Sequence, residues 1–307
     1  MTSPSDQQLM EKIKQLKQDK SVYIIAHYYQ RDEVQDIADF TGDSFGMALA
    51  ARNSPRDTIL VAGVDFMAES AVILCPNKTI LTPEPLATCP MANSIDVSDV
   101  LAYKRQQPDA LVVSYVNTPA AIKAVSDVCV TSSNAVRIIQ KLPPETRIFF
   151  IPDENLGRYV AAKLGREFDY FPSFCPIHAA VTAQNIRMLK AEHPDAEVMV
   201  HPECSPSVIE LADYVGSTSG MVNHAIETAR TPLIIGTECG IRHKIKQLCP
   251  DKELILADPG LLCPNMKSIT LEKILNSLLE MQTQVTVPED IRIRAAVALE
   301  KMIELAS

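Results

Sequence analysis

The chain has 307 residues, of which 47% are apolar and 22% charged, values that are ordinary for a soluble globular protein. Its net charge of −9 argues against broad nucleic-acid binding, which requires a basic surface. The apolar runs are short, and none approaches the ~20 residues of a membrane span. The first 20 residues are polar and lack the apolar core of a secretory signal, so we expect a cytoplasmic protein with no membrane contact.

The first third of the chain predicts strands that alternate with helices, which is typical of a parallel sheet with right-handed crossovers. Continuous apolar strands indicate that helices cover both faces of this sheet. The predicted elements in chain order are an amphipathic helix Asp6–Asp19, strand Val22–His27, helix Val34–Ala38, strand Asp39–Gly42, helix Phe45–Arg52, strand Thr58–Ala62, helix Phe66–Leu74 and strand Thr79–Thr82.

The same order of landmarks recurs twice more, with a period of about 87 residues. The first apolar run of each unit leads to His27, Tyr115 and His201. An aspartate then precedes a hydroxyl residue, in the pairs Asp39 and Ser44, Asp127 and Ser132, and Asp213 and Thr218. A further apolar run opens a turn at Ile59–Gly63, Ile148–Pro152 and Leu233–Thr237.

These repeats predict an α/β fold of three pseudo-threefold-related αβα sandwich units, each with a short parallel sheet. Amphipathic helices at the two ends, the second over Glu289–Leu305 after Pro288, are expected to cover the exposed sides of the units. The expected divisions are an N-terminal helix at 1–20, units at 21–107, 108–194 and 195–285, and a C-terminal helix at 286–307.

Three of the eight cysteines occupy one position of the repeat, each followed by proline: Cys89, Cys175 and Cys263. No C-x-x-C pair occurs, so zinc ribbons and ferredoxin runs lack support. Three dispersed thiolates suit a 4Fe–4S cluster with one open iron, or a zinc ion that keeps a water ligand, and the spacing leaves both open. The other five are interpreted as core residues: Cys75, Cys129, Cys204, Cys239 and Cys249. Cys204 and Cys239 lie near the polar motifs, so each stays open as an alternative ligand.

Polar landmarks follow the apolar runs at the edge where parallel sheets bind ligands, beyond the carboxyl ends of the strands. Ser44, Ser132 and Thr218 are predicted to begin helices, either as N-caps or as binders of anionic groups, and spacing alone favours neither. Glu203 lies two residues after His201, so both side chains would point the same way on an extended strand. No P-loop or G-x-G-x-x-G motif supports a nucleotide cofactor.

The segments AHYYQ (26–30), GDS (42–44), CPMA (89–92), SYVNT (114–118), TSSNA (131–135), CPIHA (175–179), HPEC (201–204), GSTSGM (216–221) and CPN (263–265) together resemble the quinolinate synthase family. The resemblance runs from about residue 20 to 285. It implies condensation of iminoaspartate with dihydroxyacetone phosphate to quinolinate, phosphate and water in NAD biosynthesis. It also implies that L-aspartate oxidase supplies the imine, through transient contact between the two enzymes.

The resemblance also implies roles for individual residues. The cluster ligands would be Cys89, Cys175 and Cys263, holding one 4Fe–4S cluster with an open iron that acts as a Lewis acid. Catalytic roles would fall to Tyr29, His201 and Glu203. Substrate-binding positions would be His27, Ser44, Tyr115, Val116, Asn117, Ser132, His178, His201, Pro202, Glu203 and Thr218. Tyr28, which varies in the family, is expected to face away from the site.

Three other interpretations remain open at this stage. A diphthamide synthase-type enzyme also uses three related units with one cluster cysteine each, but would cleave S-adenosylmethionine and act on a protein. A non-catalytic iron–sulfur carrier or sensor would not need Tyr29 or Glu203. A zinc hydrolase would use the same cysteines for a different metal.

Overall fold

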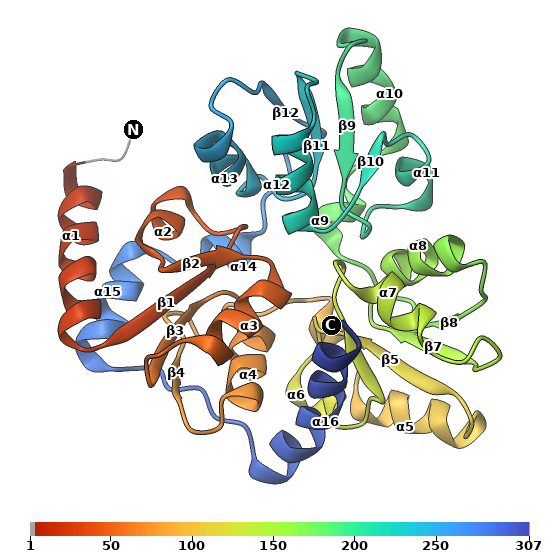
Figure 1. The fold of residues 1–307 in the computed structure, drawn as a ribbon, viewed down its shortest axis with the longest axis horizontal. Helices are drawn as coiled ribbons and strands as arrows, with labels where there is room; N and C mark the ends of the chain where they lie inside the picture. Colours follow the sequence, from red (N-terminus) through yellow and green to blue (C-terminus); the bar gives the residue numbers. More distant parts are fainter. Residues whose placement is uncertain (1–3, 307) are drawn as a thin grey trace.

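The computed structural model describes residues 4–306, which form three four-stranded sheets with helices on both faces (Figure 1). All neighbouring strands within the sheets are parallel, and the three strand orders are equivalent: β2-β1-β3-β4, β6-β5-β7-β8 and β10-β9-β11-β12. The predicted fold class, three αβα units, is therefore confirmed.

The elements of the first unit agree with the predicted ones to within two residues. They are α1 Pro4–Asp19, β1 Val22–His27, α2 Asp32–Ile37, β2 Phe40–Gly42, α3 Ser44–Asn53, β3 Thr58–Ala62, α4 Asp65–Leu74, β4 Thr79–Leu81 and the 3-10 turn η1 Ala92–Ser94. The central strands β1 and β3 are almost wholly buried, which accounts for their continuous apolar sequences.

The second and third units repeat this order. The second contains α5 Val97–Gln106, β5 Leu111–Tyr115, α6 Ala120–Lys123, β6 Val128–Val130, α7 Ala135–Gln140, β7 Ile148–Ile151, α8 Glu154–Leu164, β8 Asp169–Tyr170 and α9 Pro176–Ala179. The third contains α10 Ala183–Glu192, β9 Glu197–Val200, α11 Pro206–Ile209, β10 Tyr214–Val215, α12 Thr218–Glu227, β11 Leu233–Gly236, α13 Ile241–Leu248, β12 Leu254–Leu256 and α14 Pro264–Lys267. Helices α15 Leu271–Glu280 and α16 Glu289–Ala306 follow.

A repeated aspartate fixes the same corner of each sheet. Its carboxylate accepts a hydrogen bond from a backbone N–H of the first strand, at 2.9, 2.7 and 2.8 Å in the pairs Asp39–Ile24, Asp127–Val112 and Asp213–Val198. The same carboxylates form ion pairs with Lys17, Lys104 and Lys190 on the preceding helices. Helices α1, α5 and α10 are thus equivalent, and we propose that each repeat begins with its helix.

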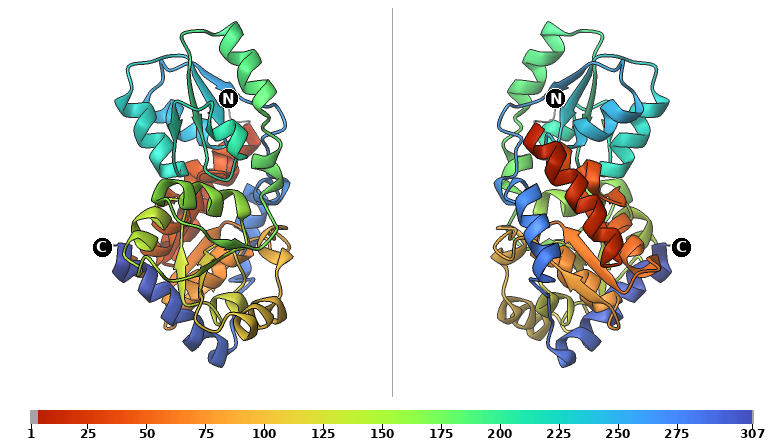
Figure 2. Two further views of the ribbon diagram at one scale, coloured as in Figure 1. Left: turned by 90° about the vertical axis from the view of Figure 1, so that its right-hand side faces the viewer. Right: turned by 90° about the vertical axis from the view of Figure 1, so that its left-hand side faces the viewer.

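Helix α15 closes the ring of units. Like α10, it begins after a threonine whose side chain accepts a hydrogen bond from a backbone N–H of the first turn, Thr270 here and Thr182 there. It packs beside α1 in the first unit, as Figure 1 and the right-hand view of Figure 2 show. The chain therefore returns to its first unit after completing the third.

Helix α16 joins the first two units. It packs on α4, α6, β6 and α7, and its residues Ala295, Leu299 and Met302 are fully buried in a cluster that runs through both units. The sheet of unit three is filled by two separate clusters. The C-terminal helix thus covers units one and two rather than all three.

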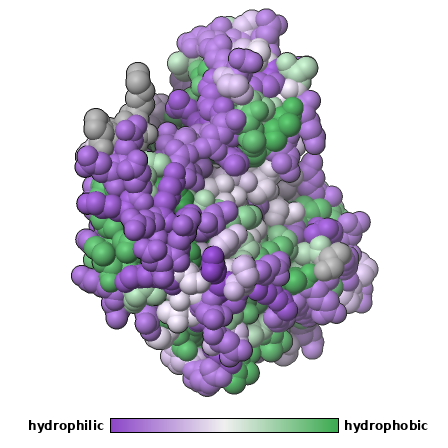
Figure 3. Space-filling model, turned by 60° about the vertical axis from the view of Figure 1, so that its left-hand side comes forward, coloured by the Kyte–Doolittle hydropathy of each residue, from purple (hydrophilic) through white to green (hydrophobic). Residues whose placement is uncertain are grey.

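The outer surface is mostly hydrophilic on the face that Figure 3 presents, with hydrophobic residues in separate patches. Within residues 4–306, no helix has the length and apolar character needed to cross a membrane.

Candidate active site

The carboxyl ends of the strands from all three sheets meet around one cavity of about 160 Å³. Each unit contributes one cysteine to its wall: Cys89, Cys175 and Cys263. The remaining polar wall also draws on all three units and consists of His27, Tyr29, Asp43, Ser44, Thr88, Tyr115, Asn117, Thr131, Ser132, His178, His201, Glu203, Thr218, Glu238 and Asn265.

The three Cys-Pro pairs at the cavity each begin a helix or a helical turn. Cys175 and Cys263 are the N-cap residues of α9 and α14, with proline at the first helical position, where a missing N–H is tolerated. The carbonyl of each cavity cysteine accepts a 3.0 Å hydrogen bond from the residue four positions later, in the pairs Cys89–Asn93, Cys175–Ala179 and Cys263–Lys267. The repeated dipeptide therefore sets the backbone of the thiol-bearing residue.

Burial raises the pKa of all three thiols, that of Cys89 to about 12, while a backbone N–H three residues later donates to each sulfur and favours the thiolate. The three donors are the N–H groups of Ala92, His178 and Met266. A bound metal group would replace the thiol protons, since metals bind the deprotonated sulfur. The donor set therefore fits a metal or an iron–sulfur group.

The other five cysteines do not line this cavity. Cys75, Cys129 and Cys204 are buried in the core, as predicted. Cys239 and Cys249 are half-buried, so the prediction that they are core residues is wrong.

A second donor group shares the cavity. One ligand atom each from Cys175, His178 and Glu203 lie within 4.8 Å of one another, a spacing that could hold a single metal ion. The Glu203 carboxylate is already engaged, however, because it lies 2.8 Å from His178 Nδ1 and accepts a 2.6 Å hydrogen bond from the Tyr115 hydroxyl.

Glu203 is held in its ionised form. Burial opposes the charge, but His178, His201 and the Tyr115 hydroxyl outweigh burial and hold the pKa of this carboxyl well below its usual range. The residue lies in a turn after β9, not on the extended strand that the sequence predicted. Its side chain nevertheless shares the cavity with His201.

His27 and His201 are neutral imidazoles with the same orientation. Burial lowers the pKa of each to about 3. In both, Nδ1 accepts a hydrogen bond from the backbone N–H two residues later, at 3.1 Å from Tyr29 and 3.3 Å from Glu203. The proton therefore sits on Nε2, which in His201 lies 3.2 Å from the Ser132 hydroxyl.

Tyr29 belongs to a hydroxyl network at the boundary of units one and three. Its hydroxyl lies 2.6 Å from Thr237 Oγ1 and 3.3 Å from Thr218 Oγ1, and Thr237 also lies 2.8 Å from His178 Nε2. Burial and the Glu203 carboxylate raise the pKa of Tyr29 well above its ordinary value, so this phenol keeps its proton at neutral pH.

Ser44 and Thr218 are the first residues of α3 and α12, but they are not the caps. Asp43 and Ser217 accept the capping hydrogen bonds from Gly46 and Gly220 instead. The prediction that Ser132 begins a helix is also wrong, because a turn separates it from α7. The N-cap interpretation of these three hydroxyls is thereby removed, and all three line the cavity.

A profile of the family described as quinolinate synthetase A protein matches residues 11–304. The chain belongs to this family. Among its relatives, quinolinate synthase of Geobacter metallireducens is 47% identical over 97% of both chains. Quinolinate synthases of Desulforudis audaxviator and Methanosarcina barkeri are 46% and 45% identical, over 97% and 96% of this chain and 98% and 97% of their own.

The structure brings together most residues that the family resemblance singled out. Val116 and Pro202 are the two that do not line the cavity; both are buried, and Val116 faces a small apolar space behind the wall. Tyr28 also lies outside the wall, in a buried cluster with residues of unit three. Asn117 Oδ1 is buried at the wall without a hydrogen-bond partner among the described residues, so it is available to a ligand.

Sequence reasoning missed several polar residues around the cavity, namely Asp43, Asp153, Thr237, Glu238 and Lys267. Thr237 had a visible signal, since it ends the third apolar strand of its unit with a hydroxyl. Lys267 had none: its ammonium reaches back to the carbonyl of Tyr29 at 2.7 Å and to Glu238 at 3.0 Å, contacts that only the fold creates.

Proposed function

We propose that this chain catalyses the condensation of iminoaspartate with dihydroxyacetone phosphate to quinolinate, phosphate and water, using one 4Fe–4S cluster. The observation that carries the proposal is the meeting of one cysteine from each unit at a cavity whose other walls hold acids, bases and hydroxyls. Relatives at 45–47% identity over nearly the whole chain bear the name quinolinate synthase.

Cys89, Cys175 and Cys263 would hold the cluster. When bound by three thiolates, such a cluster supplies a Lewis-acidic iron without a protein ligand, which can polarise the oxygen or nitrogen of a substrate. The remaining residues would bind the substrates and move the protons.

Acid and base roles follow from pKa values that their surroundings push apart. Tyr29 keeps its proton and is the acid that donates it to a leaving hydroxyl. Glu203 is ionised and is the base that takes a proton from carbon during bond formation and isomerisation. His201 offers the Nε2–H of its neutral tautomer as a hydrogen bond to a substrate oxygen.

The anionic parts of the substrates would bind at the hydroxyl side of the cavity. Ser44 and Thr218 begin helices whose free N–H groups and dipoles favour phosphate or carboxylate groups. Ser132, Asn117 and the Nε2–H of His27 add neutral donors. A pair of small anions can thus be held by few cationic side chains, in agreement with the acidic composition of the chain.

Anaerobic turnover of iminoaspartate with dihydroxyacetone phosphate tests the proposal, with iron, sulfide and zinc measured on the same sample. Quinolinate formation should scale with a content of four irons and four sulfides per chain. Full activity in protein free of iron would contradict it. A stoichiometric zinc content would favour a hydrolase built on Cys175, His178 and Glu203, and cleavage of S-adenosylmethionine would favour a diphthamide synthase-type enzyme.

The proposal also includes the source of the imine and the cellular compartment. L-aspartate oxidase is the proposed source of the unstable imine, through transient contact. The cytoplasm is the proposed compartment.

A further inference from the structure

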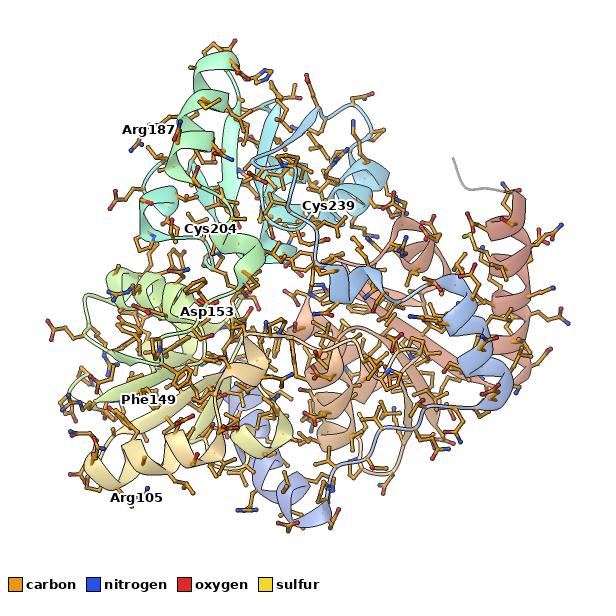
Figure 4. All side chains as sticks on the ribbon, turned by 180° about the vertical axis from the view of Figure 1, so that it is seen from behind. Arg105, Phe149, Asp153, Arg187, Cys204 and Cys239 are labelled. Atoms are coloured by element: carbon orange, nitrogen blue, oxygen red, sulfur yellow. The ribbon has the colours of Figure 1, made fainter. Side chains whose placement is uncertain are left out.

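Three buried or half-buried acids at the starts of helices have no part in the proton transfers above. Asp65, Asp153 and Glu238 each follow the third strand of their unit and lie at or just before the start of the next helix, so they recur with the period of the repeat. Asp153 and Glu238 are almost fully buried, with 0% and 1% of their surfaces exposed. Figure 4 places Asp153 on the inner side of unit two, toward the meeting point of the units, whereas Arg105 lies at the outer edge.

Each of these carboxylates holds the backbone of the cavity cysteine of its own unit. Asp153 Oδ2 accepts from the N–H of Cys175 at 3.3 Å, and Glu238 Oε1 accepts from the N–H of Cys263 at 3.2 Å. In unit one the backbone N–H of Cys89 faces the Asp65 carboxylate and is among the groups that favour its ionised form.

A second hydrogen bond near each cavity cysteine also recurs in all three units. In every unit a backbone N–H at or next to the acid donates to the carbonyl two residues before the cysteine, at 2.8 Å in the pairs Asp65–Ala87, Glu154–Ser173 and Cys239–Leu261. The cysteine carbonyl also accepts a hydrogen bond within each Cys-Pro turn. Together these hydrogen bonds fix the backbone on both sides of the cysteine. The freedom left to the thiol is then mainly rotation about its own side-chain bond.

We propose that Asp65, Asp153 and Glu238 are positioning residues that hold the three thiols in place for the cluster. The inference rests on the cluster of the proposed function. The side-chain oxygen that accepts from the cysteine N–H lies 3.3 Å away in unit two and 3.2 Å away in unit three, so each acid fixes the loop that carries its cysteine. Partners of this kind, which orient metal ligands without touching the metal, typically contribute 10–100-fold in metal affinity.

Asp153 allows this role to be separated from helix capping, because its two oxygens have different partners. Oδ1 accepts from the N–H of Leu156 at 2.8 Å and caps α8, while Oδ2 accepts from Cys175. Asparagine caps helices as well as aspartate does. Asp153→Asn therefore keeps the cap and replaces the acceptor of the cysteine N–H by an amide NH₂, which cannot accept.

The matched control is Asp127→Asn in the same unit. Asp127 also holds a backbone N–H, that of Val112 at 2.7 Å, but it lies at the outer corner of the sheet and contacts no cysteine. Both variants are reconstituted anaerobically with iron and sulfide. Release of iron to a ferrous chelator is then followed together with the visible absorbance of the cluster.

Asp153→Asn should release iron about 10–100-fold faster than the unmodified chain and show an altered absorbance band, whereas Asp127→Asn should match the unmodified chain in both. Asp153→Glu, which keeps an acceptor of the kind that Glu238 supplies in unit three, should restore slow release. If Asp153→Asn does not fold, Asp65→Asn takes its place, because Asp65 is half-buried and caps no helix through a distant N–H.

Wild-type release and absorbance in Asp153→Asn, or in Asp65→Asn where it takes its place, would overturn the inference. So would an equal acceleration in Asp127→Asn, which would mean that general loosening is enough. Neither outcome touches the proposed function, which fails instead if the unmodified chain binds no iron and sulfide or makes no quinolinate.

Discussion

Units one and two differ from unit three in how they are held. The first two share one buried apolar cluster and are joined by α16, although unit two also has a smaller cluster of its own. The sheet of unit three is packed by two clusters that are separate from the shared one. Unit three meets unit one through polar contacts, including His243 with Asp36 at 2.7 Å and the Gln35 side chain with the carbonyl of Gly240 at 3.0 Å, and through Tyr28, which packs in an apolar cluster of unit three. The cavity lies between units one and two, which are joined by α16, and unit three. Its geometry therefore depends on the position of unit three relative to the other two.

The largest expected effect comes from removing the thiol that unit three contributes. Cys263→Ser should lower quinolinate formation by more than about 100-fold, since losing a metal ligand costs more than losing a partner of one. The cluster absorbance should fall in parallel. Cys249→Ser is the matched control in the same unit, because Cys249 is half-buried outside the cavity. Comparable losses in both variants would contradict the assignment of ligands.

The next effect tests the contact between unit three and unit two. Glu203→Gln keeps the shape of the side chain but removes the charge of the proposed base, so kcat should fall by roughly 10²–10⁴-fold. Glu197→Gln on β9 is the control, since Glu197 pairs with His224 and Thr228 away from the cavity. Steady-state kinetics at saturating substrate concentrations measure kcat for both variants. An unchanged kcat in Glu203→Gln would show that Glu203 takes no part in the proton transfers.

The difference in cores predicts different responses to cavity-forming mutations. Leu299→Ala in α16 should lower the free energy of unfolding of units one and two by ~2–5 kcal/mol, because the side chain is fully buried between them. Ile245→Ala in α13 should act mainly on unit three. Native-state hydrogen exchange measures each unit separately. Equal loss of protection in all three units after either change would show that the cores are coupled.

The smallest expected effect is a pH dependence of stability that arises from the contact between unit three and unit one. Hydrogen bonds to Asp32 and Asp36 on α2 raise the pKa of His243 to about 9. A His pKa raised above its unfolded value of about 6.5 stabilises fully below that value, and the contribution is lost as pH rises through about 9. His243 is partly exposed, so we expect under ~1 kcal/mol.

Thermal unfolding from pH 6 to pH 10 measures this contribution. The unmodified chain should lose slightly more stability over that range than His243→Gln, which cannot titrate at this position. Parallel curves for the two proteins would mean that the contact between α13 and α2 adds nothing to the stability of the interface.

Much of this architecture was predictable because the repeat is visible in short sequence patterns. Apolar runs of four to six residues end at polar side chains, and parallel sheets bring such ends to one edge. Cys89, Cys175 and Cys263 could therefore be expected at one place before any contact was known. Cys75 and Cys249 share the dipeptide and match each other across units one and three, but Ala161 stands at the equivalent position in unit two, which separates them from the complete trio.

What escaped prediction depends on contacts between units. Lys267 reaches the carbonyls of Tyr29 and Gln30, more than two hundred residues away, and no local pattern announces such a bond. The caps of α3 and α12 were misassigned by one residue, since Asp43 and Ser217 compete with their hydroxyl neighbours for the same position. That shift freed Ser44 and Thr218 for the cavity.

Helix α15 bears on how this chain arose. It follows the third cysteine as α5 and α10 follow the first two, and it begins with the same kind of capped turn. The position that holds Lys104 in α5 and Lys190 in α10 holds the buried Leu278 in α15, because α1 already supplies the lysine for Asp39. A tandem triplication that also copied the first helix of a fourth repeat would produce this arrangement. The additional helix, α15, would then have been retained because it packs on the first unit.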